Sequence, residues 1–116
     1  KANKVVGVYR FLVDGTGHEV HITHRNAVWE LMLDGQAMGV LTHGCDRVLT
    51  AEQHVLDFGI PRAGSDEECL LACARMTWLP AKLRWSYRLY VNNTDVPACY
   101  KVFWGEIADV TPPEVG

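Results

Sequence analysis

Residues 84–91 read Arg-Trp-Ser-Tyr-Arg-Leu-Tyr-Val, and apolar side chains occupy every second position of this stretch. The odd positions hold Trp, Tyr, Leu and Val, whereas Arg84, Ser86 and Arg88 lie between them. Successive side chains of a β-strand point to opposite faces of the sheet. This period of two therefore predicts a strand that buries one face and exposes the other.

The same period recurs along the chain, and turn residues separate the runs. Asp14-Gly15 and Asp34-Gly35 are each a strong signal for a tight hairpin turn. Asn92-Asn93 follows the stretch quoted above, and asparagine tolerates the left-handed backbone of such turns. We therefore predict an all-β domain, an antiparallel β-sandwich of about seven to eight strands. The expected strands span residues 4–13, 17–24, 27–34, 36–42, 53–59, 69–78, 82–92 and 99–104.

Two of these segments also have helical features. Thr50-Ala51-Glu52-Gln53 resembles a capped helix start, although Gly59 and Pro61 would end that helix within about two turns. Glu67 to Met76 is the second segment, because its residues are tolerated in helices. We favour a strand in both places.

The length of 116 residues fits one domain. We assign residues 1–110 to the sandwich and 111–116 to a tail, because Thr111-Pro112-Pro113 is typical of a chain that leaves a domain. The sequence opens on Lys1 without an apolar stretch, so we expect a piece of a longer protein and no signal peptide here.

Composition bounds the expected partners. The 11 basic and 14 acidic residues give a net charge of −3, and no basic block stands out, which argues against nucleic acid. No apolar run approaches the roughly 20 residues that cross a bilayer, and no polybasic segment favours a membrane surface. Four cysteines are too few for a disulfide scaffold, and free thiols suit a reducing, cytoplasmic location. We expect other proteins as partners.

Several side chains are of the types that serve as catalytic or metal-binding groups. His18, His21 and His24 would cluster on a helix, but on a strand His21 faces away from the other two. His43-Gly44-Cys45 places a thiol beside an imidazole, and Asp66-Glu67-Glu68 is an acidic run without a calcium-loop pattern. We expect packed thiols and polar loops at these places, and therefore no enzyme, metal or cofactor.

Tryptophan and arginine supply the best candidates for a contact surface. Tryptophan is enriched at the energetic centres of protein interfaces, although in a small sandwich it more often fills the core. The two arginines on the polar side of residues 84–91 would flank such a surface, unless they pair with carboxylates across the sheet. The candidate residues are Trp29, Trp78, Arg84, Trp85, Arg88 and Trp104.

A series of strand and turn residues also carries a family resemblance. The series comprises 9–13 with Asp14-Gly15, 19–22, 26–31 with Asp34-Gly35, and 85–93 with Val96-Pro97. Over residues 5 to 98 it resembles a domain of the Fas apoptotic inhibitory molecule family. The resemblance implies a compact antiparallel β-sandwich that acts without catalysis, through contacts that restrain death-receptor signalling and protein aggregation. Members carry two such domains, whereas this sequence has one.

These observations predict a non-catalytic protein-interaction module, with regulation of apoptosis or protein aggregation as the role that the resemblance implies. Recognition would use a sheet face or an exposed strand edge, with aromatic anchors. Two alternatives stay open: a structural docking domain of a larger assembly, and a β-sandwich that binds a small apolar ligand or a carbohydrate. A thiol enzyme built on Cys45 is a further rival.

Overall fold

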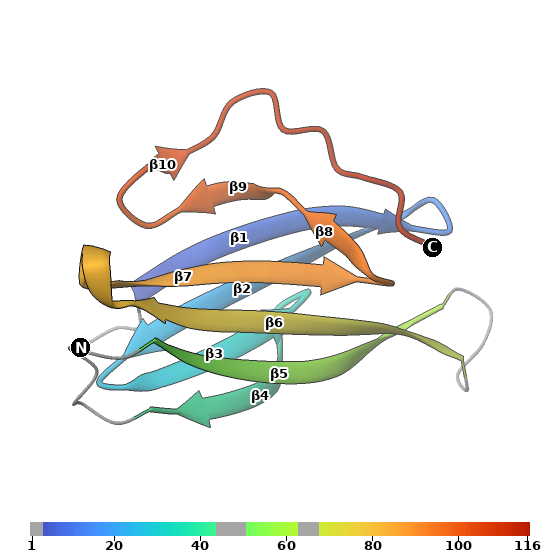
Figure 1. Ribbon diagram of the computed structural model, residues 1–116. Coiled ribbons are helices and arrows are strands. Elements are labelled where there is room, and N and C mark those ends of the chain that lie inside the picture. The colour runs from blue at the N-terminus through green and yellow to red at the C-terminus, as the bar shows by residue number, and fades with distance from the viewer. Residues whose placement is uncertain (1–3, 44–50, 63–67) are drawn as a thin grey trace.

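The computed structural model describes residues 4–43, 51–62 and 68–116 (Figure 1). The described residues contain strands and one short 3-10 helix, and none of their helices is long and apolar enough to cross a membrane. The elements are β1 (Lys4–Val13), β2 (Thr16–Arg25), β3 (Val28–Leu33), β4 (Gln36–Thr42), β5 (Glu52–Pro61), β6 (Cys69–Leu79), η1 (Pro80–Lys82), β7 (Arg84–Val91), β8 (Thr94–Val96), β9 (Ala98–Lys101) and β10 (Gly105–Glu106).

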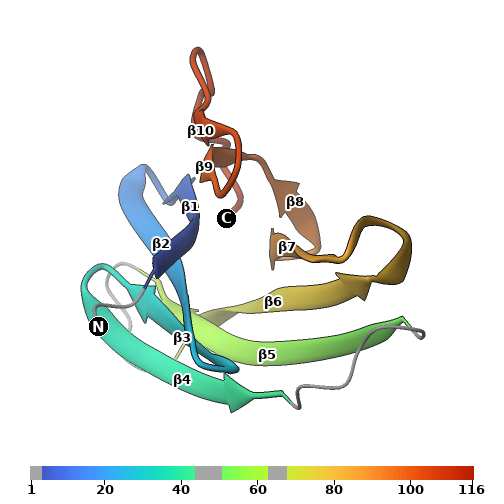
Figure 2. The same ribbon diagram turned by 90° about the vertical axis from the view of Figure 1, so that its left-hand side faces the viewer.

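Two antiparallel sheets pack face to face, as the sequence predicts for a sandwich. One has the strand order β10-β9-β1-β2-β3-β4 and the other β5-β6-β7-β8. β4 meets β5 where the sheets come together on one side. On the other side the chain leaves the end of β8 and crosses to β9, which pairs with β1 (Figure 2). The all-β antiparallel sandwich is confirmed.

The predicted strands are present, and the differences lie at their ends and in the shortest elements. In the described parts of the two segments with helical features, β5 begins at Glu52 and β6 begins at Cys69. β8 and β10 went unpredicted because three and two residues are too few to show a period of two. The strand expected over 99–104 ends at Lys101, since the chain turns at Phe103, where φ is 74°.

Tight turns join the hairpins where the sequence indicates them. Asp14 and Gly15 have φ of 50° and 78°, and Asp34 and Gly35 have 50° and 83°. Asn92 and Asn93 have φ of 50° and 61°. Positive φ at both central residues matches the right-handed twist of the flanking strands. These turns fix the register, and with it the face that each side chain occupies.

The core follows from the alternation along each strand. On β6 the buried side chains are Leu70, Ala72, Ala74 and Met76, and on β7 Leu89 and Val91 are fully covered. β1 and β2 contribute residues from the opposite sheet. Apolar burial of this kind supplies the main driving force for the fold.

The segment 111–116, expected as a tail, lies back along β1. The N–H of Leu12 donates to the carbonyl of Pro113 at 2.8 Å, and the N–H of Val115 donates to Leu12 at 2.9 Å. The side chain of Val115 is buried, and the Asn92 amide donates to its carbonyl at 3.0 Å. Leu12 and Glu114 form a parallel bridge, so the segment lies alongside β1 as an added stretch of strand.

One core residue predicts a stabilising substitution. Tyr9 is 2% exposed, and its hydroxyl has no hydrogen-bond partner among the described residues. Burial raises the pKa of this phenol, as expected for a group that is costly to ionise there. Replacing Tyr9 by Phe removes an unsatisfied polar atom and should raise the free energy of unfolding by about 1 kcal/mol in chemical denaturation.

Tyr87→Phe is the matched control for Tyr9→Phe. The hydroxyl of Tyr87 accepts a hydrogen bond from the indole N–H of Trp29 at 3.4 Å, so its removal should not stabilise the fold. Equal stabilisation by both substitutions would show that the isolation of the Tyr9 hydroxyl is not the cause.

Candidate binding groove

The edge of β7 is only partly covered by a neighbouring strand. β6 pairs with β7 along its length, whereas β8 pairs only with residues 89–91. β8 ends at Val96, and Pro97, which has no N–H, precedes the crossing to β9 in the other sheet. Among the described residues, no strand pairs with Arg84–Arg88 on the side opposite β6.

The main-chain groups at this open edge belong to Trp85 and Tyr87. Val91 and Thr94 flank the two-residue turn, so they form the hydrogen-bonded pair that closes the hairpin. Successive residues of an antiparallel strand direct these groups to alternate edges. The main-chain N–H and C=O groups of the odd-numbered residues of β7 therefore point away from β6. Those of Leu89 and Val91 point toward β8, and those of Trp85 and Tyr87 point toward the open edge. An exposed edge of this kind is a template for another strand.

Hollows of ≈ 230 and ≈ 210 Å³ adjoin along the open edge, and a third of ≈ 210 Å³ continues past Pro97. β7 forms one wall, and the turn between β9 and β10 forms the other. We call this surface the β7 groove; its aromatic walls and apolar lip are Trp78, Leu83, Trp85, Tyr87, Phe103 and Trp104.

The lip of the β7 groove is unusually exposed for apolar side chains. Phe103 is 73% exposed, Trp104 is 71% exposed, and Leu83 across the groove is 63% exposed. An exposed apolar patch with a polar rim is typical of an interaction site. Two adjacent aromatic residues at the tip of one turn give such a patch large contact area with few rotatable bonds.

The rim of the β7 groove is basic. The two hollows that contain Trp85 are lined by Lys4, Lys82, Arg84 and Lys101 and by no Asp or Glu of the described chain. Asp95 lines the third hollow, where it pairs with Arg88. None of the four forms an ion pair with a carboxylate in the described ranges, although Lys4 lies over the ring of Phe103 at 5.4 Å. A chain of net charge −3 thus places four cations around one groove.

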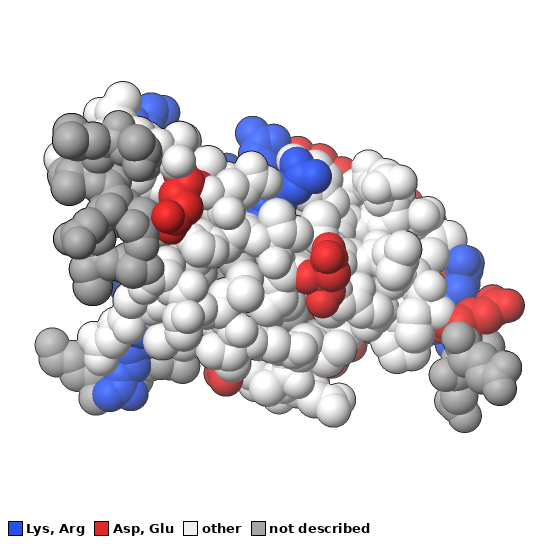
Figure 3. All heavy atoms as spheres, turned by 60° about the horizontal axis from the view of Figure 1, so that its bottom comes forward, with Lys and Arg blue, Asp and Glu red and all other residues white. Residues whose placement is uncertain are grey.

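Three arginines elsewhere in the described chain are neutralised by a nearby carboxylate. Arg10 hydrogen-bonds Glu19 at 2.8 Å, and Arg62 and Arg88 bond Asp14 and Asp95. On the face around β4 and β5 the charged side chains are scattered, with wide uncharged areas between them (Figure 3). The four basic residues of the groove differ from these three arginines, because none of the four has a carboxylate partner among the described residues.

An aromatic cluster behind the groove holds its wall in place. The ring of Trp29, from the opposite sheet, lies edge-on to Trp85 at a centroid distance of 4.5 Å. His43 and His24 lie at 4.4 and 5.3 Å from the same ring. Because Trp29 is 1% exposed, this contact belongs to the core, and it fixes the position of the Trp85 ring at the groove.

Two of these histidines touch through their ring nitrogens. Nε2 of His24 lies 2.9 Å from Nε2 of His43, so one ring must donate and the other accept. Burial, together with the nearby His43, lowers the pKa of His24. Protonation of both rings would remove the acceptor and place two like charges in contact.

The lowered pKa of His24 predicts acid sensitivity. A histidine of the unfolded chain takes up its proton near pH 6.5, above the pKa that His24 has in the fold. The contribution of His24 to the free energy of unfolding should therefore fall as the pH drops below about 6.5 and level off below its folded-state pKa, whereas the contributions of Asp14 and Glu19 are lost at lower pH. Denaturation of the wild type and His24→Gln at a series of pH values checks this, and parallel profiles would contradict it.

The structure brings together some of the predicted contact residues and separates others. Trp78, Arg84, Trp85 and Trp104 all line the β7 groove. Trp29 is in the core and has no surface to offer a partner. Arg88 sits at the far end, where Asp95 holds its guanidinium at 3.2 Å.

Sequence reasoning missed several residues of the groove. Lys4, Lys82 and Lys101 come from three distant segments, and their convergence depends on the strand order. Leu83 and Phe103 were not singled out either. The Phe103-Trp104-Gly105 run was a usable signal, since two aromatic residues before a glycine suit an exposed turn.

The three histidines of β2 do not lie together on one face of the strand. His18 and His24 lie on the inner side of β2, and His21 lies on the outer side beside Glu19, as predicted for a strand. No group of three His, Cys, Asp or Glu side chains in the described chain could hold a metal ion. Cys45, Asp66 and Glu67 lie outside the described residues.

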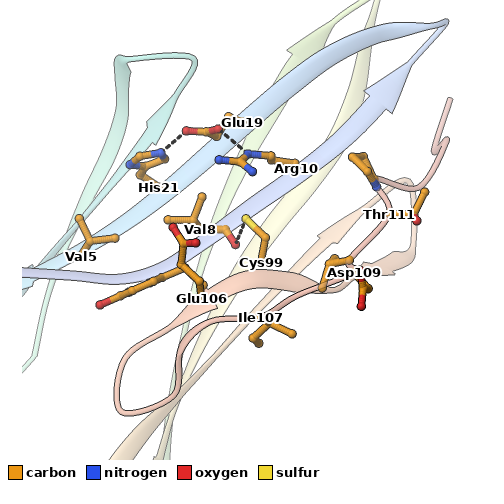
Figure 4. Close-up of a pocket in the computed structure, with 13 residues that line it drawn as sticks. Val5, Val8, Arg10, Glu19, His21, Cys99, Glu106, Ile107, Asp109 and Thr111 are labelled. Atoms are coloured by element: carbon orange, nitrogen blue, oxygen red, sulfur yellow. Dashed lines mark hydrogen bonds and ion pairs between the residues drawn. The ribbon is translucent and has the colours of Figure 1, made fainter.

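A larger pocket of ≈ 630 Å³ lies on the outer face of the six-stranded sheet, under residues 106–112 (Figure 4). Its charged floor is paired: Arg10 donates to one oxygen of Glu19, and His21 contacts the other. These partners, Arg10 first, lower the pKa of Glu19. The Cys99 thiol donates to the carbonyl of Val8 at 3.4 Å. The pocket has room for a small ligand, but these groups already satisfy one another.

Comparison of the chain with protein-family models, with curated proteins and with solved structures finds no match.

Proposed function

We propose that the domain is a non-catalytic protein-interaction module, which binds an extended acidic segment of a partner protein along the β7 groove. The open edge of β7 carries this proposal. A strand added there would bond the free main-chain groups of Trp85 and Tyr87, the mode of recognition known as β-augmentation. Its carboxylates would meet a rim of unpaired basic residues.

Charge selects an acidic partner over a second copy of this chain. Two copies joined antiparallel at β7, centred on Ser86, would bring Arg84 of each opposite Arg88 of the other, so that basic residues face basic residues. Like charges in an interface cost binding free energy, whereas carboxylates would be attracted and steered into the groove. The aromatic lip supplies the apolar anchors that such an interface needs.

The family resemblance supports the same class of function, because members of the Fas apoptotic inhibitory molecule family act through contacts. A role in apoptosis or protein aggregation, and a cytoplasmic location, stay predictions.

Binding of a fluorescein-labelled peptide rich in Glu and Val, followed by anisotropy, tests the proposal. Arg84→Glu should weaken binding at least about tenfold, since it turns an attraction into a repulsion. The matched control is Arg75→Glu on β6, an exposed arginine that lines none of the groove. It changes the net charge equally and should alter the affinity less than about twofold.

A second comparison tests the aromatic lip. Trp104→Ala should weaken peptide binding, whereas Leu71→Ala, at an equally exposed position on β6, should not. If the two arginine variants lose affinity equally and the two alanine variants do not differ, the β7 groove is not the contact surface.

Binding of a small ligand is the second candidate function, and the outer-face pocket favours it. Its volume of ≈ 630 Å³ is typical of ligand sites. Val8→Trp would fill part of this pocket without touching the wall made by Trp85. A ligand found by thermal shift that fails to bind Val8→Trp but binds Trp104→Ala would assign function to this pocket instead.

A further inference from the structure

Resting on the proposed function, we infer that the partner strand has a defined order of residues. From its N-terminus the order is apolar, polar, apolar, acidic, placed opposite Tyr87, Ser86, Trp85 and Arg84. The order follows from the direction of the added strand and from the two faces of β7.

β8 sets the direction of the added strand. It runs antiparallel to β7 with Leu89 opposite Val96, and the open edge begins where β8 ends. A strand that continues the line of β8 is therefore antiparallel to β7. Residues opposite Tyr87 and Trp85 would each exchange both main-chain hydrogen bonds with their partner.

The inward positions call for apolar side chains. Residues that oppose each other across a ladder share a face of the sheet, so the two opposite Tyr87 and Trp85 point between the sheets. There they would meet Val6, Val102 and Phe103, which line the hollow of ≈ 230 Å³. β-branched residues such as valine suit this half-buried surface.

The outward positions differ in charge, and this difference fixes the orientation. Arg84 has no carboxylate partner within the described ranges, so an acidic residue opposite it gains an ion pair. Arg88 is already engaged by Asp95 at 3.2 Å. A carboxylate at that end would lie near Asp95, which disfavours the reversed strand.

Labelled peptides of one composition test the order. One carries Val-Thr-Val-Glu between Gly-Ser flanks. One carries the reverse order, which turns both valines inward only when its Glu lies opposite Arg88, near Asp95. One carries Val-Val-Thr-Glu, in which no register turns both valines inward, because adjacent residues of a strand face opposite sides. The first should bind at least about tenfold more tightly than either of the others. Equal affinity for all three would overturn the order while leaving the groove as the binding site; no binding of any peptide would overturn the proposed function itself.

A charge exchange supplies the matched control. Arg84→Glu should prefer a peptide with Lys in place of the Glu, with its affinity recovered to within about threefold, whereas Arg75→Glu should keep the preference for Glu. Failure of the exchange would overturn the pairing with Arg84.

Other occupants of the groove are outcomes of the same experiment. Sedimentation that shows dimers of the wild type but monomers of Trp104→Ala would assign the groove to a second copy. Vesicles containing phosphatidylserine that bind the wild type but not Trp104→Ala, with no peptide binding, would assign it to a lipid surface. Either result would overturn the inferred partner.

Discussion

Replacing Trp29 by alanine is expected to lower the free energy of unfolding by about 3–5 kcal/mol. The indole is 1% exposed and lies between the sheets, with Trp85 at 4.5 Å and Tyr87 at 6.5 Å between ring centroids. Removal of the indole leaves a cavity between the two sheets, because a close-packed core fills it only in part. The hydroxyl of Tyr87 also loses its hydrogen-bond partner. Chemical denaturation followed by circular dichroism measures the loss.

Trp104→Ala is the control for that substitution. Trp104 is 71% exposed, so its loss should change stability by about 0.5 kcal/mol or less. The two variants distinguish a core tryptophan from a contact tryptophan. Trp29→Ala should lose stability, whereas Trp104→Ala should lose peptide affinity. Equal stability of Trp29→Ala and Trp104→Ala would contradict the packing of the two sheets described above.

Deletion of residues 113–116 is expected to lower the free energy of unfolding by about 3 kcal/mol. It removes the buried side chain of Val115, worth about 1.5–3 kcal/mol, and main-chain hydrogen bonds worth about 1 kcal/mol each, against a smaller entropy cost of ordering the chain. The midpoint and slope of a urea titration give the difference.

Val115→Ala isolates the side chain from the backbone. It should cost about 2 kcal/mol and leave the hydrogen bonds to Leu12 in place. Glu114→Ala, at an exposed position of the same segment, should be neutral. A deletion without effect would mean that this segment does not hold onto β1 in solution.

The strands and hairpins could be predicted from local sequence because their causes are local. Alternation over residues 84–91 and the Asp-Gly and Asn-Asn turns act within a few residues of one another. The C-terminal segment could not be predicted in the same way. Locally, Thr111-Pro112-Pro113 is typical of a chain that leaves a domain. The segment lies along β1 because it hydrogen-bonds Leu12, which is about a hundred residues away in the sequence.

Only some residues of the β7 groove could be predicted from the sequence, for a similar reason. Trp78, Arg84 and Trp85 come from neighbouring strands, so the sequence could single them out together. The lysines that make the groove basic come from β1, η1 and β9, and their meeting depends on the order of strands in two sheets. Trp29 shows the converse, because nothing local distinguishes a tryptophan that bridges the sheets from one on the surface.

Amide hydrogen exchange at Trp85 and Tyr87, followed by NMR with and without the Val-Thr-Val-Glu peptide, tests strand addition at β7 most directly. In the free protein these two amides should exchange faster than those of Ser86 and Arg88, which face β6. Saturating peptide should slow both at least about tenfold. Peptide that binds while Trp85 and Tyr87 exchange at their free rates would contradict strand addition at this edge.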